Sequence, residues 1–186
     1  MRIIAGDFKG FRLRSTKGMG TRPTSDKIKE TIFNMIGPFF SGGLCLDLFA
    51  GSGSLGLEAL SRGIDKVVFV DKNQQAIKCV YQNIEHVKST GNTKVLRMDA
   101  FRTIKFLANK QKKFNLIILD PPYDEIKIEG LLKEINIAEI LAIDGIIMAE
   151  HKGKLKLESN SSFNIAKEKL INQTTTITIL KRKKDS

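Results

Sequence analysis

The sequence predicts an α/β protein with a mostly parallel sheet covered by helices on both faces. Short apolar runs alternate along the chain with stretches of helical periodicity. The runs are nearly continuous in apolar residues, which is typical of parallel strands buried on both faces. The five runs are residues 44–49, 67–70, 95–98, 116–119 and 146–149.

The segments between these runs favour helices. In residues 73–88 the apolar side chains fall on one helical face, and residues 100–110 and 127–141 show the same periodicity. Two further β-like stretches, near residues 163–167 and 174–180, close the chain. Their short connection predicts an antiparallel hairpin at the sheet edge.

Two elements precede the sheet. Residues 2–5 and 11–14, separated by GDFKG, predict a small β-hairpin with basic residues along it. The following RPTSDKIKETIFNMI predicts a helix capped by Thr24 or Ser25. We therefore expect a basic hairpin extension over residues 1–22 and one domain over residues 23–186.

The bulk composition fits one intracellular domain. The chain has 186 residues, of which 41% are hydrophobic, and no apolar run reaches the length of a membrane span. The N-terminus lacks the apolar region and cleavage site of a signal peptide. Cys45 and Cys79 have no metal-ligand spacing, so we expect reduced, packed thiols in a cytoplasmic protein.

The net charge of +11 is concentrated at the two ends of the chain. Residues 1–31 hold eight basic and three acidic residues, and the terminal KRKKDS holds four and one. Basic ends on a nearly balanced body indicate arms that bind a polyanion, most simply nucleic acid. The alternative is a charge run that only improves solubility.

The stretch LDLFAGSGSLGLEAL, residues 46–60, runs from a strand through a glycine turn into a helix. Gly51 and Gly53 permit positive φ, and the helix start offers free N–H groups to an anion. A P-loop is excluded because no Gly-Lys-Ser/Thr follows. With Gly56 the motif fits G-x-G-x-x-G, and Asp71 follows Gly51 by twenty residues, so a dinucleotide site is one interpretation.

Four successive strands end in or near a carboxylate: Asp47, Asp71, Asp99 and Asp120. Ligands of open α/β sheets bind outside these strand ends, so we expect the acids to share one crevice. Such a row favours a nucleoside with a cationic amino-acid tail. Asp71 would bind ribose hydroxyls, and Asp99 the adenine amine, with the Ala100 N–H near the ring. The alternative for Asp99 is a helix N-cap.

The fourth strand ends in ILDPPYD. Pro121 and Pro122 stiffen the corner and remove two N–H donors, while Asp120 and the proline carbonyls accept hydrogen bonds. A rigid, acceptor-rich patch beside the Tyr123 ring suits a planar group with an –NH2, such as a nucleobase. The alternative is a plain tight turn.

These motifs resemble a known family. DLFAGSG with DPPY resembles Rossmann-like S-adenosylmethionine-dependent methyltransferases that act on exocyclic amines of bases. RIIAGDFKGFRL, RPTSDKIKETIFN, CLDLFAGSGSLGLEALSRG and KEKLINQTTTITILKRK are similar to the bacterial family that methylates guanine N2 in 16S ribosomal RNA. The resemblance implies a seven-stranded sheet of order 3-2-1-4-5-7-6 with strand 7 antiparallel. It also implies S-adenosylmethionine as donor, S-adenosylhomocysteine as product and no metal.

The resemblance also implies roles for individual residues. Asp120, Pro121, Pro122 and Tyr123 would form the base-amine site, with Tyr123 stacking on an extracted base. The cofactor contacts would be Asp47, Phe49, Gly51, Gly53, Asp71, Asp99, Ala100 and Thr24, with Arg22 and Pro23 near the methionine end. Glu150 and His151 receive no role, and His86 is expected at the surface.

The expected partner is 16S rRNA, within a small ribosomal subunit or an assembly intermediate, bound by a monomer away from membranes. Lys9, Arg12, Arg14 and Arg22 at one end, and Lys181, Arg182, Lys183 and Lys184 at the other, would contact phosphates. Other functions stay open: a DNA or RNA adenine-N6 or cytosine-N4 methyltransferase, an NAD-dependent oxidoreductase, or an inactive RNA-binding assembly factor.

Overall fold

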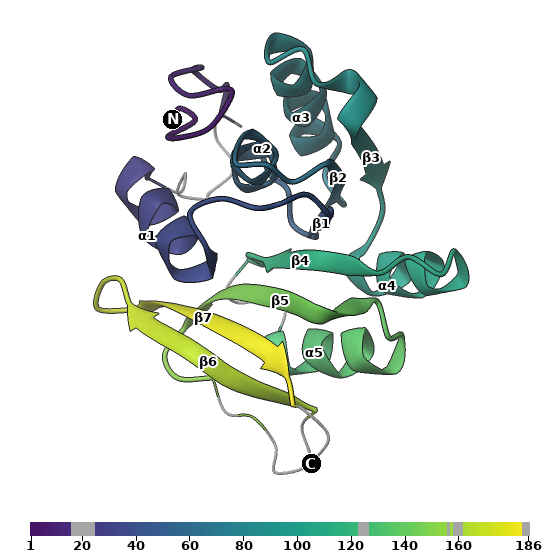
Figure 1. The fold of residues 1–186 in the computed structure, drawn as a ribbon. Coiled ribbons are helices and arrows are strands. Elements are labelled where there is room, and N and C mark those ends of the chain that lie inside the picture. The colour runs from purple at the N-terminus through teal and green to yellow at the C-terminus, as the bar shows by residue number, and fades with distance from the viewer. Residues whose placement is uncertain (16–24, 123–126, 156, 158–161, 184–186) are drawn as a thin grey trace.

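The fold is a single seven-stranded sheet in the order β3-β2-β1-β4-β5-β7-β6 (Figure 1). The computed structural model describes residues 1–15, 25–122, 127–155, 157 and 162–183. The strands are β1 (Leu44–Asp47), β2 (Lys66–Asp71), β3 (Thr93–Arg97), β4 (Phe114–Leu119), β5 (Leu141–Lys152), β6 (Phe163–Leu170) and β7 (Thr175–Arg182). Strands β1 to β5 pair in parallel, and β7 is antiparallel to β5 and β6. The expected strand order is confirmed.

Helices cover both faces of the sheet (Figure 1). They are α1 (Asp26–Ile36), α2 (Ser54–Ser61), α3 (Gln74–His86), the short 3-10 helix η1 (Thr90–Asn92), α4 (Ala100–Asn109) and α5 (Ile128–Ile137). The apolar sides of α1, α2 and α3 share one core cluster, and those of α4 and α5 share the other. Among the described residues, no helix is both long and apolar enough to cross a membrane.

The helix starts follow the capping chemistry of the sequence. Of the two expected caps for α1, the Ser25 hydroxyl accepts from the Ile28 N–H at 3.3 Å, while Thr24 lies outside the described residues. Asn73 caps α3, accepting from the Gln75 N–H at 2.7 Å. These polar caps satisfy N–H groups that the first turn of a helix leaves without partners.

The expected helix over residues 127–141 is wrong at its end. Helix α5 stops at Ile137, and Leu141 already pairs with Phe114 as the start of β5. The register then shifts, so that the next β4 partner, Leu116, faces Ile146. The irregular stretch between them contains Gly145 and the 88% exposed Ile143. It therefore lacks the continuous apolar pattern of the other strands.

The N-terminal segment, residues 1–15, folds back on itself and packs against the domain. Arg2 and Arg12 form one isolated antiparallel bridge, with hydrogen bonds from Ile3 N–H to Phe11 O and from Leu13 N–H to Met1 O, both 3.0 Å. Ile3 and Leu13 are buried in the core cluster shared by α1 and α2. The backbone of this segment is therefore part of the fold, and its basic side chains face outward.

Candidate functional site

The carboxyl ends of the parallel strands bring the four strand-end acids to one edge of the sheet. Asp47 and Asp71 end β1 and β2, Asp120 follows β4, and Asp99 lies two residues after β3. The chain runs outward from β1 through β2 to β3 and, on the other side, from β4 to β5. The carboxyl ends of β1 and β4 therefore form the switch point, which is where open α/β sheets bind ligands.

The loop after β1 has the backbone that its glycines predict. Gly51 and Gly53 adopt φ of 54° and 79°, and Gly53 is the N-cap of α2. The Ala50 N–H donates to Val70 O at 2.8 Å, which carries the loop across the end of β2. A Cβ on Gly56 would lie 2.3 Å from the Phe69 ring. The third glycine of the motif therefore allows close packing of α2 on β2.

Asp71 and Asp47 both hold this loop. Asp71 Oδ2 accepts from the Gly51 N–H at 2.9 Å, and its Oδ1 from the Asn73 N–H at 2.8 Å. Each carboxylate oxygen has a second lone pair, so half-buried Asp71 can still accept from hydroxyls of a ligand. Asp47 is only 1% exposed and accepts from the Gly56 N–H at 3.0 Å. It lies beneath the loop and supports it.

Burial gives Asp47 an unusual protonation equilibrium. Desolvation by burial, opposed by the Gly56 hydrogen bond and assisted by the nearby Asp71 charge, raises the pKa of the Asp47 carboxyl to about 7. A buried carboxyl prefers its neutral form when no cation compensates its charge. A cation bound at this edge would favour the ionised form.

Asp99 acts as the N-cap of α4. Its Oδ1 accepts from the N–H groups of Phe101 and Arg102 at 2.9 and 3.1 Å. Ala100 behind it is buried. Asp99 is exposed and also lines an open pocket of about 550 Å³ with Lys72, Arg97, Met98, Arg102 and Phe106. The capping alternative is confirmed, and the same residue also forms part of the pocket wall.

The Asp120–Pro121–Pro122 corner lies at the end of β4. Burial raises the pKa of the Asp120 carboxyl well above its usual value, and the charges of Glu150 and Asp47 raise it further. Pro121 is buried and Pro122 is half-buried, and neither has an N–H group. The corner is thus rich in acceptors. Tyr123, Arg22 and Pro23 lie outside the described residues.

Glu150 joins this corner, although no role was expected for it. Leu119 pairs with Ala149 in the parallel β4–β5 register, so Asp120, just after the end of β4, lies beside Glu150, two residues before the end of β5. Glu150 and Pro121 line a pocket of about 150 Å³, together with Lys127, Ile128, Glu129, His151, Lys152, Lys154 and Leu155. Glu150 directly follows the apolar run 146–149, so the rule that identified the other strand-end acids also applies to it.

The two histidines have structural contacts. His151 is buried, with its Nε2 atom 2.8 Å from the Thr178 hydroxyl on β7. His86 packs edge-on against Phe11, with ring centroids 5.5 Å apart. Phe49 is half-buried and packs on the core cluster of the α4 and α5 face.

The expected RNA-binding residues fall in two separate places. Lys9, Arg12 and Arg14 are exposed on the N-terminal segment. Because β7 is antiparallel to β5, its last residues lie toward the amino end of β5, and Lys181 pairs with Ile146, the first β5 residue in this pairing. Lys181 and Arg182 therefore lie at the edge of the sheet opposite the acids, and Lys183 follows them; Lys184 is outside the described residues. The structure does not bring the two basic ends together.

Asn83 on α3 ties the N-terminal segment to the glycine loop. Its Oδ1 accepts from the Arg14 N–H at 2.8 Å, and its Nδ2 donates to Arg14 O at 3.0 Å and to Ser52 O at 2.8 Å. The Asn83 side chain is fully buried. One amide thus fixes the end of the segment and the middle of the loop together.

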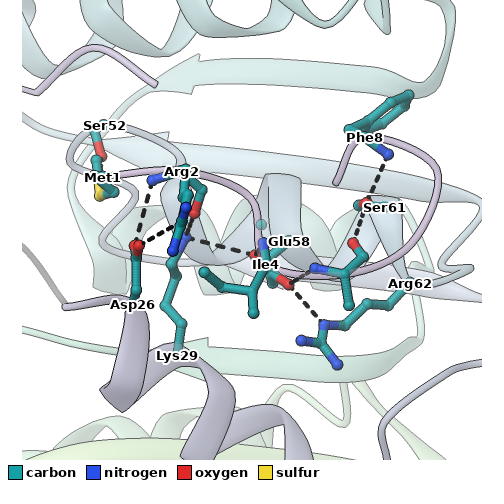
Figure 2. Close-up of polar contacts among 12 residues, drawn as sticks. Met1, Arg2, Ile4, Phe8, Asp26, Lys29, Ser52, Glu58, Ser61 and Arg62 are labelled. Atoms are coloured by element: carbon teal, nitrogen blue, oxygen red, sulfur yellow. Dashed lines mark hydrogen bonds and ion pairs between the residues drawn. The ribbon is translucent and has the colours of Figure 1, made fainter. Parts of the chain in front are cut away.

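Figure 2 shows a second anchor of the N-terminal segment, centred on Glu58 of α2. The fully buried Glu58 accepts from the N–H groups of Ile4 and Ala5 at 2.8 and 3.1 Å. Arg62 Nε lies 2.8 Å and Lys29 Nζ 3.5 Å from its carboxylate oxygens. A buried carboxylate with two cations and two amides is well satisfied, and this contact fixes the start of the chain beside α1 and α2.

Comparison with known proteins gives consistent matches over nearly the whole chain. The family model described as "Conserved hypothetical protein 95" matches residues 1–180. The "Putative rRNA methyltransferase YlbH" of Bacillus subtilis is 48% identical over 157 residues, covering 84% of this chain and 85% of that protein. The "Ribosomal RNA small subunit methyltransferase D" of Escherichia coli is 34% identical over 178 residues, covering 93% and 86%.

A solved structure agrees with the fold. The structure described as "Putative methyltransferase yhhF from Escherichia coli" superposes with a TM-score of 0.84 at 30% identity. The match covers 98% of this chain and 97% of that one. The sheet, the flanking helices and the N-terminal segment therefore all lie within a shared architecture.

Proposed function

The chain belongs to the family described as Conserved hypothetical protein 95, and we propose that it methylates the N2 amine of a guanine in 16S rRNA with S-adenosylmethionine. This is the family of the small-subunit ribosomal RNA methyltransferase D proteins. The observation that carries the proposal is the adjacency of two features at the switch point. The glycine loop follows β1 and the Asp120–Pro121 corner follows β4, and Asp47 pairs with Ile118 in neighbouring parallel strands. A donor over the loop and an acceptor at the corner would therefore meet.

The charges of the site suit a cationic ligand. Burial and the charges of neighbouring carboxylates raise the pKa values of Asp47 and Asp120, which means that added positive charge at this edge would be stabilised. S-adenosylmethionine supplies a methyl group activated by a sulfonium cation. The N–H groups at the start of α2 would bind its carboxylate, Asp71 would accept from the ribose hydroxyls, and the pocket beside Asp99 would receive the adenine.

The corner would prepare the acceptor. The lone pair of a guanine amine is shared with the ring, which makes the nitrogen a weak nucleophile. Asp120 and a proline carbonyl would accept its two N–H bonds, orient the lone pair outward and stabilise the positive charge that grows on nitrogen. The remaining work is alignment of nitrogen, methyl carbon and sulfur. Tyr123 would stack on the extracted base.

The N-terminal segment would bind RNA close to this edge. Lys9, Arg12 and Arg14 are exposed, and Asn83 fixes their segment to the glycine loop. Phosphate contacts of this kind position RNA without reading sequence. Lys181 and Arg182, at the opposite edge, would contact a separate stretch of a large substrate such as a small-subunit particle.

The test is methyl transfer from donor with a labelled methyl group to small-subunit particles, bare 16S rRNA and DNA, followed by mass analysis of the nucleosides. The expected product is N2-methylguanosine at one position of 16S rRNA. Methyl groups on adenine N6 or cytosine N4 would establish the alternative base. Tighter binding of NAD than of S-adenosylmethionine in a titration would overturn the proposal.

A further inference from the structure

We propose that Glu150 selects guanine by accepting the N1–H of the target base, while the neighbouring Asp120 accepts from its N2 amine. This inference rests on the proposed function and identifies the residue that would restrict methyl transfer to guanine. Asp120 is then the acceptor for the reacting amine, and Glu150 is a specificity-determining residue beside it.

The geometry provides two acceptors side by side. The parallel pairing of Leu119 with Ala149 places Asp120, which follows β4, beside Glu150 of β5, and neighbouring strands lie about 4.8 Å apart. The two carboxyl groups are close enough that the Glu150 charge raises the pKa of Asp120. Two carboxyl side chains that extend from neighbouring backbones can converge on adjacent donors at one edge of a planar base.

Glu150 is also placed where a base would enter. It is only 8% exposed and, with Pro121, lines the pocket of about 150 Å³ between the end of β5 and the start of α5. Pro121 belongs to the amine-binding corner, so the pocket and the corner are continuous. A base whose amine reaches Asp120 would bring its neighbouring ring nitrogen toward Glu150.

The chemistry of the bases gives this arrangement its selectivity. Guanine presents N1–H directly beside its N2 amine, so both positions donate. Adenine and cytosine present a ring nitrogen lone pair beside their amines. A second carboxylate therefore binds guanine and repels the other two bases, in which a buried acceptor would face another acceptor. A mismatch of this kind discriminates by about 10⁴–10⁵ in a dry site.

The test replaces the target guanine, once mapped, by 2-aminopurine or hypoxanthine in reconstituted small-subunit particles. 2-Aminopurine keeps the 2-amino group but has a lone pair at N1, and hypoxanthine keeps N1–H but lacks the amine. The native protein should methylate guanine well, 2-aminopurine at least 100-fold less efficiently, and hypoxanthine not at all. Equal efficiency on guanine and 2-aminopurine overturns the inference without any variant.

The variant Glu150→Gln adds a second readout. The glutamine amide can donate to the N1 lone pair of 2-aminopurine, so the guanine-to-2-aminopurine ratio of kcat/KM should fall at least tenfold. Because both enzymes are compared on the same two bases, effects of the missing O6 atom cancel. The matched control is Glu85→Gln, an exposed acid on α3 that does not line this pocket, and it should leave the ratio unchanged. An unchanged ratio in a folded Glu150→Gln protein would refute the role of Glu150.

The two failures are distinguishable. Methylation of the hypoxanthine-containing particle would show that the amine is not the acceptor, which contradicts the proposed function itself. Loss of discrimination against 2-aminopurine in the native protein, with methyl groups still on guanine N2, contradicts only the role of Glu150.

Discussion

The carboxylate of Asp71 at the end of β2 holds the backbone N–H of Gly51 at 2.9 Å. The two residues lie twenty positions apart in the sequence, and the contact joins the ends of two neighbouring strands. Asp71 thereby shapes the glycine loop. In the proposed function its remaining lone pairs would accept from the ribose hydroxyls.

Asp71→Ala should therefore weaken cofactor binding. Loss of a charged acceptor costs about 1.5–3 kcal/mol, so the Kd for S-adenosylmethionine measured by calorimetry should rise about 10–100-fold. Asp65→Ala is the matched control, because Asp65 Oδ2 accepts from the Gly43 N–H at 2.7 Å at the other edge of the sheet. Equal losses in both variants would mean that the effect is structural.

Asp120→Ala should remove methyl transfer and leave cofactor binding largely intact. Loss of a preorganised electrostatic partner lowers kcat by about 10²–10³, while the Kd for S-adenosylhomocysteine should change by less than about threefold, roughly 0.7 kcal/mol. Asp144→Ala, an exposed acid on β5, serves as control. Turnover near the native rate would contradict the acceptor role of the corner.

Asp47→Asn should stabilise the ligand-free protein at high pH. The pKa of Asp47 is about 7 in the folded protein, against an ordinary value of 3.8. The protonated Asp47 carboxyl therefore makes its full contribution to the stability of the folded protein below pH 4. That contribution is lost as the pH rises through 7 and the buried carboxyl ionises. Asparagine keeps an acceptor for the Gly56 N–H without the charge.

Urea unfolding of both proteins at several pH values measures this effect. At pH 8 the free energy of unfolding of the variant should exceed that of the native protein by on the order of 2–4 kcal/mol. This difference should shrink toward zero near pH 4. A difference that does not depend on pH would show that burial of the Asp47 charge is not its cause.

Gly56→Ala should destabilise the fold through the contact of α2 with β2. The added Cβ would lie 2.3 Å from Phe69 Cε1 and 3.0 Å from Asp47 Oδ2. Overpacking of this kind costs about 1–3 kcal/mol. Gly130→Ala on α5 is the control. Among the described residues its Cβ would meet only Phe101 Cζ, at 3.8 Å, and helix propensity should raise stability by about 0.5–1 kcal/mol. Thermal unfolding of the two variants should thus shift in opposite directions.

Neutralising Arg12 and Arg14 together should weaken RNA binding. Because this change removes two cations that would each neutralise a phosphate, the slope of log K against log salt should become less steep by about 1.4–1.8 units. The corresponding double change at Lys181 and Arg182, at the opposite edge of the sheet, should have the smaller effect on methyl transfer. An unchanged salt slope in the Arg12 and Arg14 variant would exclude the N-terminal segment as a phosphate-binding surface.

The elements that could be predicted from sequence are those with local signals. The apolar runs, the glycines with positive φ and the strand-end acids all depend on residues close in the chain. The start of β5 has no such signal, because Gly145 and the exposed Ile143 interrupt its apolar pattern.

The buried polar partners also lack a local signal. Lys29 lies 29 residues from its partner Glu58, and the burial of both is visible only once α1 and α2 pack together. Glu150 is different, since it follows an apolar run as the other acids do. Its partnership with Asp120 depends on the β4–β5 register, which no spacing in the sequence encodes.

The anchoring of the N-terminal segment limits how the protein can be engineered. The Met1 sulfur lies 3.9 Å from the Ser52 hydroxyl in the glycine loop, so an affinity tag fused ahead of Met1 would begin next to the proposed cofactor site. Strand β7 ends at Arg182, at the far edge of the sheet. Purification handles and surface-immobilisation linkers should therefore be attached at the C-terminal end.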